Sequence, residues 1–401
     1  MEVQLKTYPA KNGDCFLVSF GNSGERKKHM LIDCGYFDTV NNYLKTDLTL
    51  VSKNGEYLEK LILTHIDADH IQGAIKLLKD NNVENFIQIR EIWHNTFRHL
   101  FKREIEEGAN VDTINIQIIK QIVQRGYPKN VQKDGKSAIS AEQGTAVGAL
   151  ILQGEYAWNS DFKNKAVCVE NGRIICVDIN STIYLLSPNN EKLEKLKDLW
   201  KNELKKYDVN YLSKNDELYD DAFEMLMTWE KNALPRTPKQ ISATKDLNVE
   251  TLITLPIIED TTPTNGSSIA FVLQIQEKKL LFLADAHPNL ILESLNEYQK
   301  NDVIFFDIIK VSHHGSMNNI SKQLLDKIDS EKYIFSTNGA KHNHPDLETI
   351  ASIIVRKTTF NRCLYFNYRT SNSEFFNRKD WIEKYNYSIY YIDNIPYTIE
   401  L

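Results

Sequence analysis

The sequence contains no long uninterrupted apolar run, and this absence excludes whole classes of protein. No stretch of its 401 residues approaches the roughly 20 consecutive apolar residues of a membrane-spanning helix. The amino-terminal stretch MEVQLKTYPAKNGDC also lacks the apolar segment of a signal peptide. We therefore expect a cytoplasmic protein without a membrane partner.

Cysteine is scarce, and neither sign of charge dominates. The five cysteines are odd in number and scattered through apolar stretches, which predicts reduced thiols in the core rather than disulfides. Charged residues make up 25% of the chain and the net charge is −6, which is ordinary for a globular protein. This balance does not indicate a long basic groove for duplex DNA, so a phosphate-bearing substrate would have to be held by local groups.

The densest group of chemically active side chains lies in the run LILTHIDADHIQG, residues 61–73. An apolar strand leads there into His65, Asp67, Asp69 and His70, and a helical pattern follows. Imidazole nitrogens and carboxylate oxygens at this density suit zinc or manganese. The alternative is a helix that Asp67 or Asp69 caps, with two incidental histidines. Capping explains one acid and neither histidine, so we predict a metal site.

Two later stretches place similar side chains after apolar strands. Asp285 follows Leu280–Ala284, where it is predicted either to bind metal or to cap the next helix. The run SHHGS follows another apolar strand and contains His313 and His314. Packing rarely explains adjacent histidines, because both rings would have to be buried and hydrogen-bonded together.

Three isolated residues are further candidates, and the first two have two possible roles each. Asp33 either orients metal ligands or forms a turn with Gly35. His94, after a predicted strand over residues 86–93, either contacts substrate or is an ordinary satisfied histidine. His344, in the run HNHP, precedes a predicted helix.

The run His65-x-Asp67-x-Asp69-His70 resembles the HxHxDH signature of the metallo-β-lactamase-fold metallohydrolases. In this variant form, with the SHHGS run, it is similar to the soluble nuclease-type domain of ComEC DNA-uptake proteins and to related phosphorylcholine esterases. The resemblance implies two divalent ions, zinc or manganese. The implied metal ligands are His65, Asp67, Asp69, His70, Asp285 and His314.

The same resemblance implies roles in catalysis. Asp69 would orient the nucleophile, Asp33 would orient ligands, and His313 would contact the scissile phosphate or protonate the leaving group. The assignments of His313 and His314 are open to exchange. The candidate substrate contacts are Ser316, His344, Asn265, Lys310 and His94.

The chain departs from the family pattern at the first metal site. By the resemblance, Asp285 would be the carboxylate that bridges the two ions. Most dinuclear relatives have a histidine where Asp67 stands, and another about 20 residues before the bridging acid, where this chain has Asn265. A site richer in oxygen makes manganese plausible there and leaves open a protein that holds only one ion tightly.

The resemblance and the order of strands and helices predict an α/β fold, a four-layer αββα sandwich with helical insertions. We expect one domain over residues 1–401: a first half at about 1–97, a helical insertion at about 98–136, a core continuation at about 137–206, an acidic insertion at about 207–262 and a second half at about 263–401. The acidic insertion would either cover the site, contact a partner or be a solvated excursion. The carboxy-terminal segments would complete the second sheet.

The leading functional hypothesis is a phosphodiesterase or nuclease in which a metal-bound hydroxide attacks phosphorus. One alternative is a hydrolase of small phosphoesters or cyclic nucleotides, because one fold hosts many chemistries. Another is a metal-stabilised interaction subunit of a bacterial, phage-defence type assembly, with a protein partner encoded nearby.

Overall fold

The computed structural model describes residues 1–101, 113–125, 146–207, 209, 216–233, 248–300 and 302–401. Parts of the expected segments 98–136, 137–206 and 207–262 therefore lie outside the described residues. Within the described ranges, no helix is both long enough and apolar enough to cross a bilayer.

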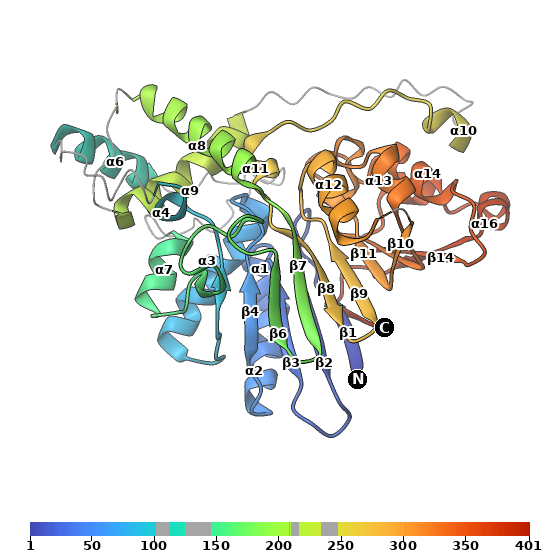
Figure 1. The fold of residues 1–401 in the computed structure, drawn as a ribbon, viewed down its shortest axis with the longest axis horizontal. Coiled ribbons are helices and arrows are strands. Elements are labelled where there is room, and N and C mark those ends of the chain that lie inside the picture. The colour runs from blue at the N-terminus through green and yellow to red at the C-terminus, as the bar shows by residue number, and fades with distance from the viewer. Residues whose placement is uncertain (102–112, 126–145, 208, 210–215, 234–247, 301) are drawn as a thin grey trace.

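Most strands of the described chain form two sheets (Figure 1). The first sheet has the order β16-β1-β2-β3-β4-β5 and the second has the order β15-β14-β13-β11-β9-β8-β7-β6. The first contains β1 (Glu2–Thr7), β2 (Phe16–Gly21), β3 (Lys28–Ile32), β4 (Leu58–Ile62), β5 (Ile92–Trp93) and β16 (Tyr397–Glu400). The second contains β6 (Ile174–Asp178), β7 (Ser181–Ser187), β8 (Ala270–Ile275), β9 (Lys278–Phe282), β11 (Ile308–Lys310), β13 (Lys332–Phe335), β14 (Arg362–Phe366) and β15 (Tyr387–Tyr391). A small parallel pair joins β10 (Ile304–Phe306) and β12 (Ile328–Ser330).

Helices flank both sheets (Figure 1). Up to residue 233 they are α1 (Phe37–Thr39), α2 (Lys45–Lys53), α3 (Ala68–Glu84), α4 (Phe97–Leu100), α6 (Thr113–Arg125), α7 (Val147–Gln153), α8 (Asn190–Lys205) and α9 (Asp216–Ala233). Beyond residue 233 they are α10 (Val249–Leu252), α11 (Pro263–Gly266), α12 (Pro288–Tyr298), α13 (Lys322–Lys327), α14 (Leu347–Ile354), α15 (Ser371–Phe375) and α16 (Lys379–Tyr385).

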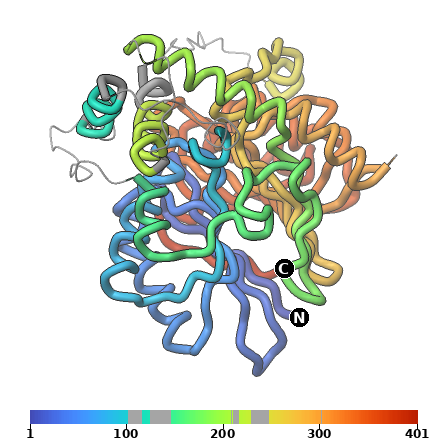
Figure 2. Tube along the Cα trace, turned by 60° about the vertical axis from the view of Figure 1, so that its left-hand side comes forward, coloured from blue at the N-terminus to red at the C-terminus, as the bar shows by residue number. Residues whose placement is uncertain are grey.

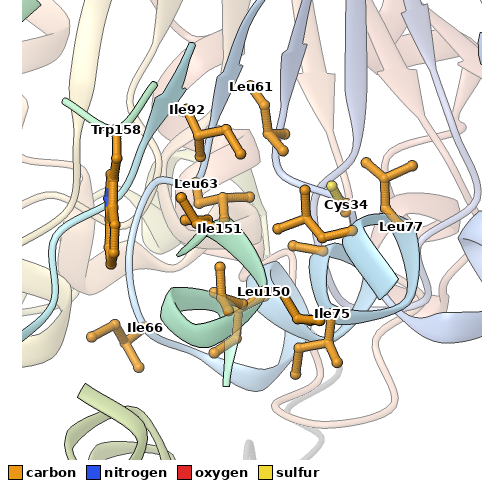
Figure 3. Close-up of a cluster of buried hydrophobic side chains, with 14 of the residues drawn as sticks. Cys34, Leu61, Leu63, Ile66, Ile75, Leu77, Ile92, Leu150, Ile151 and Trp158 are labelled. Carbon is orange, nitrogen blue, oxygen red and sulfur yellow. The ribbon is translucent and has the colours of Figure 1, made fainter. Parts of the chain in front are cut away.

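Three apolar clusters show that the layers are stacked in the order helix, sheet, sheet, helix. One cluster lies between the sheets and combines side chains such as Val18 of β2 with Phe271 of β8. A second cluster joins the outer face of the first sheet to its helices. Figure 3 shows part of it, with Leu61 and Ile92 above Leu150 of α7. The third cluster joins the second sheet to α12, α13 and α14. Each sheet therefore buries both faces, and the predicted αββα sandwich is confirmed.

The structure corrects several sequence-based expectations. Residues 387–401 do not all complete the second sheet, because β16 pairs antiparallel with β1 of the first sheet, beside the N-terminus in Figures 1 and 2. The strand expected at residues 86–93 is regular only over β5, and the strand expected before SHHGS is divided at Asp307 into β10 and β11. Asp307 accepts hydrogen bonds from Lys278 and from the backbone of Lys279, which holds the chain in this step between two sheets.

The described part of the acidic segment packs against the first half of the chain. On α9, Asp220 accepts hydrogen bonds from the backbone and guanidinium of Arg98, at 2.9 and 2.6 Å. Glu224 accepts hydrogen bonds from the backbone N–H groups of Val147 and Gly148, at 2.8 and 3.0 Å. These bonds satisfy donors at the N-terminus of α7. A solvated excursion is therefore excluded for this helix.

One acid of α9, Asp221, should make the free energy of unfolding depend on pH. Burial, together with Glu224 and Asp220 nearby, raises the pKa of Asp221 to about 7, so the folded state binds this proton more tightly than the unfolded chain. Stability from this group is present below pH about 4, the usual pKa of aspartate, and is lost as the pH rises through about 7. We expect Asp221→Asn to be more stable than wild type at pH 8 and equally stable near pH 4, as measured by urea unfolding.

The matched control is Asp198→Asn, at an exposed position of α8. Its stability relative to wild type should not change between pH 4 and pH 8. A constant difference between Asp221→Asn and wild type across this range would contradict the assignment.

Candidate metal centre

The turn between β4 and α3 places the four acidic and histidine residues of the HIDADH run in the protein interior. β4 is buried along its length, and α3 begins immediately after Asp67. Asp67 has extended backbone, and its side chain accepts a hydrogen bond from the backbone of Ala68 at 3.0 Å. This cap puts Asp69 and His70 in the first helical turn. His65, Asp67, Asp69 and His70 are each at most 3% exposed, a degree of burial that is uncommon for ionisable side chains.

Asp285 and His314 join this group from the second half of the chain. Nε2 of His65 lies 3.6 Å from Oδ2 of Asp285, and Nε2 of His70 lies 3.9 Å from its Oδ1. Nε2 of His314 lies 3.6 Å from Oδ2 of Asp69. Two groups of potential ligand atoms, His65–His70–Asp285 and Asp69–His70–His314, share His70, and the atoms of each lie within 4.8 Å of one another. Asp14, Asp33 and His70 form a third such group. Asp67 is more distant, with Oδ2 4.0 Å from Nε2 of His65.

Several of these nitrogen and oxygen atoms are buried without a hydrogen-bond partner in the described part of the chain, as expected for atoms that bind a cation. Nε2 of His70, both carboxylate oxygens of Asp285 and Oδ1 of Asp69 are buried and make no hydrogen bond to the described residues. Leaving such groups unsatisfied costs about 1–3 kcal/mol each, and more when they are charged. Nitrogen and carboxylate donors at these separations fit zinc or manganese. The residues present therefore fit the two divalent ions expected from the sequence.

Hydrogen-bond contacts at Nδ1 orient His70 and His314 toward this centre. Oδ2 of Asp33 lies 2.7 Å from Nδ1 of His70, and Asp33 also accepts hydrogen bonds from the backbone and hydroxyl of Thr64, at 2.8 and 2.7 Å. Nδ1 of His314 lies 2.9 Å from the carbonyl oxygen of Ser336. Because Nδ1 is engaged in each ring, Nε2 faces the centre, as in metal-ligating histidines generally.

The electrostatics of the centre are dominated by its carboxylates. Burial lowers the pKa of His70, but Asp33, Asp285 and Asp69 outweigh burial and raise it to about 10. Burial alone would raise the pKa of Asp285, yet the surrounding histidines hold it well below its usual range. The site thus attracts positive charge, and a bound cation would replace protons there.

Four residues around the centre have left-handed backbone. Asp33, Ala284, His313 and His314 have φ values of 52°, 46°, 45° and 57°. Non-glycine residues rarely adopt this left-handed conformation, which costs of order 1–3 kcal/mol per residue and is found mainly at functional sites. At SHHGS the consecutive left-handed residues allow both adjacent side chains to approach the centre, whereas a regular strand would point them in opposite directions.

The loop between β1 and β2 supplies residues that the candidate sites predicted from the sequence do not include. Asn12 donates a hydrogen bond to Oδ2 of Asp69 at 2.6 Å and accepts one from the Tyr36 hydroxyl at 3.0 Å. A Cβ at Gly13 would lie 2.0 Å from the carbonyl oxygen of Asp69, so only glycine permits this approach. The tandem Asn-Gly-Asp was a signal for a close backbone approach as well as for a turn.

Two predicted substrate contacts are buried in the interior. Lys310 lies beside the centre, because its partner Asp14 is 3.5 Å from Nδ1 of His314. Lys310 is 2% exposed and forms an ion pair with Asp14, so it does not reach solvent. Burial raises the pKa of Asp14, but Lys310 and His314 hold it well below its usual range. His94 is fully buried, with Nε2 3.1 Å from Oε1 of Glu224, and its ring stacks on Trp158. It joins α9 to the first half of the chain and does not line a solvent-accessible site.

The other predicted substrate contacts lie near SHHGS. His344 has its ring centroid 5.6 Å from that of His313, and its Nδ1 lies 3.2 Å from Oδ1 of Asp346. The Ser316 hydroxyl accepts a hydrogen bond from the backbone of Asn318, at 3.4 Å. Asn265 donates to Asp260, at 2.5 Å. Asp260 was not identified from the sequence. It accepts hydrogen bonds from Asn265 and Asn319, and Asn319 lies in a loop that is distant in the chain.

Comparison with known proteins finds a family-level similarity in the first part of the chain. Residues 9–119 match the model of the metallo-beta-lactamase superfamily, and this segment includes Asp33 and the run from His65 to His70. The sequence has no match among curated proteins. One similar solved structure is a long form RNase Z from yeast, with 11% identity and a TM-score of 0.37. The match covers 100% of this chain and 48% of that one, so the chain spans about half the length of that protein.

Proposed function

We propose that the protein is a metal-dependent phosphodiesterase that acts on nucleic acid. The observation that carries this proposal is that the two ligand groups share His70 and that the buried carboxylate of Asp285 faces both His65 and His70. Two divalent ions at such a centre would lower the pKa of bound water and neutralise charge on phosphoryl oxygens.

The ligand roles follow the donor atoms. Asp69, His70 and His314 form one group, and His65 and Asp285 contribute to the other, with Asp67 as the most distant donor. Asp33 holds His70 and does not itself have to contact the ions. Asp69 is fixed on one side by the hydrogen bond from Asn12, so its carboxylate would be held in place to bind metal and to orient a nucleophilic water.

The surroundings of Asp69 support a phosphate-bearing substrate. Nζ of Lys341 lies 3.9 Å from Oδ1 of Asp69 and is the cation nearest to this carboxylate that retains partial exposure, at 20%. His344 lies three residues further along the same loop, beside His313. An ammonium and an imidazole beside the metal ligands are suited to bind a phosphodiester anion. We assign Lys341 and His344 to substrate binding.

The function is tested with a panel of substrates. Purified protein is loaded with zinc or manganese and assayed on single-stranded DNA, duplex DNA, RNA, a cyclic nucleotide and a nitrophenyl phosphodiester. We expect hydrolysis of the nitrophenyl diester and of at least one polynucleotide, and its loss on chelation. Turnover of only the cyclic nucleotide and the nitrophenyl ester would favour a small-molecule hydrolase. Protein that binds metal but hydrolyses no phosphodiester would contradict the proposal.

A further inference from the structure

The side chain of His313 has its own network, distinct from that of His314. Asn319 is fully buried, and its Nδ2 donates hydrogen bonds to the carbonyl oxygen of Asp285 at 3.0 Å and to Oδ2 of Asp260 at 3.1 Å. Both partners are acceptors, so they fix the orientation of the amide. Oδ1 of Asn319 therefore faces Nδ1 of His313, at 2.7 Å. It follows that Nδ1 of His313 carries a proton.

The other nitrogen of the ring faces the metal centre. Nε2 of His313 lies 3.4 Å from Oδ2 of Asp285, the oxygen that also faces Nε2 of His65 at 3.6 Å. With the proton on Nδ1, the neutral ring presents a lone pair at Nε2. A lone pair facing a carboxylate oxygen is repulsive unless a proton or a cation lies between them.

The distance from Nε2 of His313 to Oδ2 of Asp285 distinguishes a proton from a cation between them. A charge-assisted hydrogen bond from a protonated ring would bring nitrogen and oxygen to about 2.7–2.9 Å. Two ligands of one tetrahedral ion, with bonds of about 2.0–2.1 Å, are about 3.4 Å apart. The observed 3.4 Å separation matches two ligands of one ion and exceeds a hydrogen bond.

We propose that Nε2 of His313 is a ligand of the divalent ion held by His65 and Asp285, and that Asn319, held by Asp260, positions its ring. This inference rests on the metal centre of the proposed function. Each of the adjacent histidines then serves one ion, because His314 faces Asp69. The oxygen-rich first site expected from the sequence gains a second imidazole.

Asp260 acts through Asn319 and is a positioning residue. Its backbone N–H donates to the carbonyl oxygen of Asn318 at 3.0 Å, which fixes the segment before α11 beside the SHHGS loop. Its Oδ2 lies 3.8 Å from Nδ1 of His313, too far for a direct hydrogen bond.

The proposal is tested by titrating zinc into metal-stripped full-length protein, with calorimetry and metal analysis as the readouts. His313→Gly is the informative variant, because glycine adopts the φ of 45° without strain and the fold should be retained. Wild type should bind two ions. His313→Gly should keep one ion at wild-type affinity and lose more than about 100-fold in affinity for the other, beyond the range of outer-shell partners.

Asn319→Ala tests the positioning role. It should weaken the same ion by about 10–100-fold and leave the other unchanged, whereas general damage to the fold would weaken both. The matched control is His342→Ala, which removes an exposed histidine of a neighbouring loop and should leave both affinities unchanged.

The outcomes separate this inference from the proposed function. Two ions bound by His313→Gly at wild-type affinity would overturn it, and a loss of turnover in that fully metallated variant would assign His313 to the substrate instead. Fewer than two ions in wild type would also overturn it. If wild type binds two ions, hydrolyses no phosphodiester, and His313→Gly loses one ion, the ligand assignment stands and the proposed function fails.

Discussion

Asp285→Asn is expected to abolish hydrolysis and to reduce the content of both metal ions. Both oxygens of Asp285 are buried without hydrogen bonds, and three histidine nitrogens lie within 3.9 Å of them. Asparagine has nearly the same volume but no charge, and its amide nitrogen is not a metal ligand. Because bound ions contribute several kcal/mol to the transition state, the rate should fall on the order of a thousandfold or more.

The substitution should leave the fold intact, since it preserves side-chain volume at the end of β9. The matched control is Asp326→Asn at an exposed position of α13, which should keep wild-type metal content and rate. Metal analysis of the dialysed proteins and the rate on a nitrophenyl phosphodiester are the measurements. An Asp285→Asn variant with full metal occupancy and an unchanged rate would contradict the assignment of this residue as the shared ligand.

Lys310→Met is expected to lower the free energy of unfolding by about 3–5 kcal/mol. Lys310 and Asp14 are an ion pair in which both side chains are at most 3% exposed. Removal of the lysine leaves the Asp14 carboxylate buried without its strongest cationic partner. An isolated buried charge is far more costly than the absence of the pair. Urea unfolding in the presence of a chelator would measure this effect without a contribution from bound metal.

The double variant Asp14→Asn/Lys310→Met should recover most of the lost stability, because it removes both charges together. Lys322→Met is the surface control, and its effect should stay within about 1 kcal/mol, as for exposed charges generally. A loss for Lys310→Met no larger than that of the control would show that the pair contributes little.

Local patterns were sufficient for much of the centre. The HIDADH run combined an apolar strand, an N-cap and a helical repeat, and each of these depends on residues within a few positions of one another. The structure has β4, the Asp67 cap and α3 as that pattern predicts. It also rules out the capping alternative for Asp285, since His287 occupies the N-cap of α12 and Pro288 its first turn. Asp33 lies against His70, in the orienting position expected from the resemblance.

Other assignments failed because residue type alone does not determine burial. Lys310 and His94 have the chemistry of substrate contacts, but neutralising partners hold them in the interior. Those partners, Asp14 and Glu224, lie 296 and 130 positions away along the chain. A partner at such a distance leaves no periodic signal. The acidic composition of α9 left a solvated excursion open as one alternative, whereas the helix uses its acids to accept hydrogen bonds from Arg98 and from the donors at the start of α7.

The sequence by itself determined the types of the candidate ligands and the layer architecture. Ligand type, strand periodicity and helix capping are short-range properties, and residues close in the chain carry them. Only the tertiary structure decided which atoms meet. It brought Asn12 to Asp69, Asp260 and Asn319 to His313, and β16 to β1. Those contacts depend on the packing of two sheets and on left-handed backbone at His313 and His314, which the whole fold stabilises and no local preference favours.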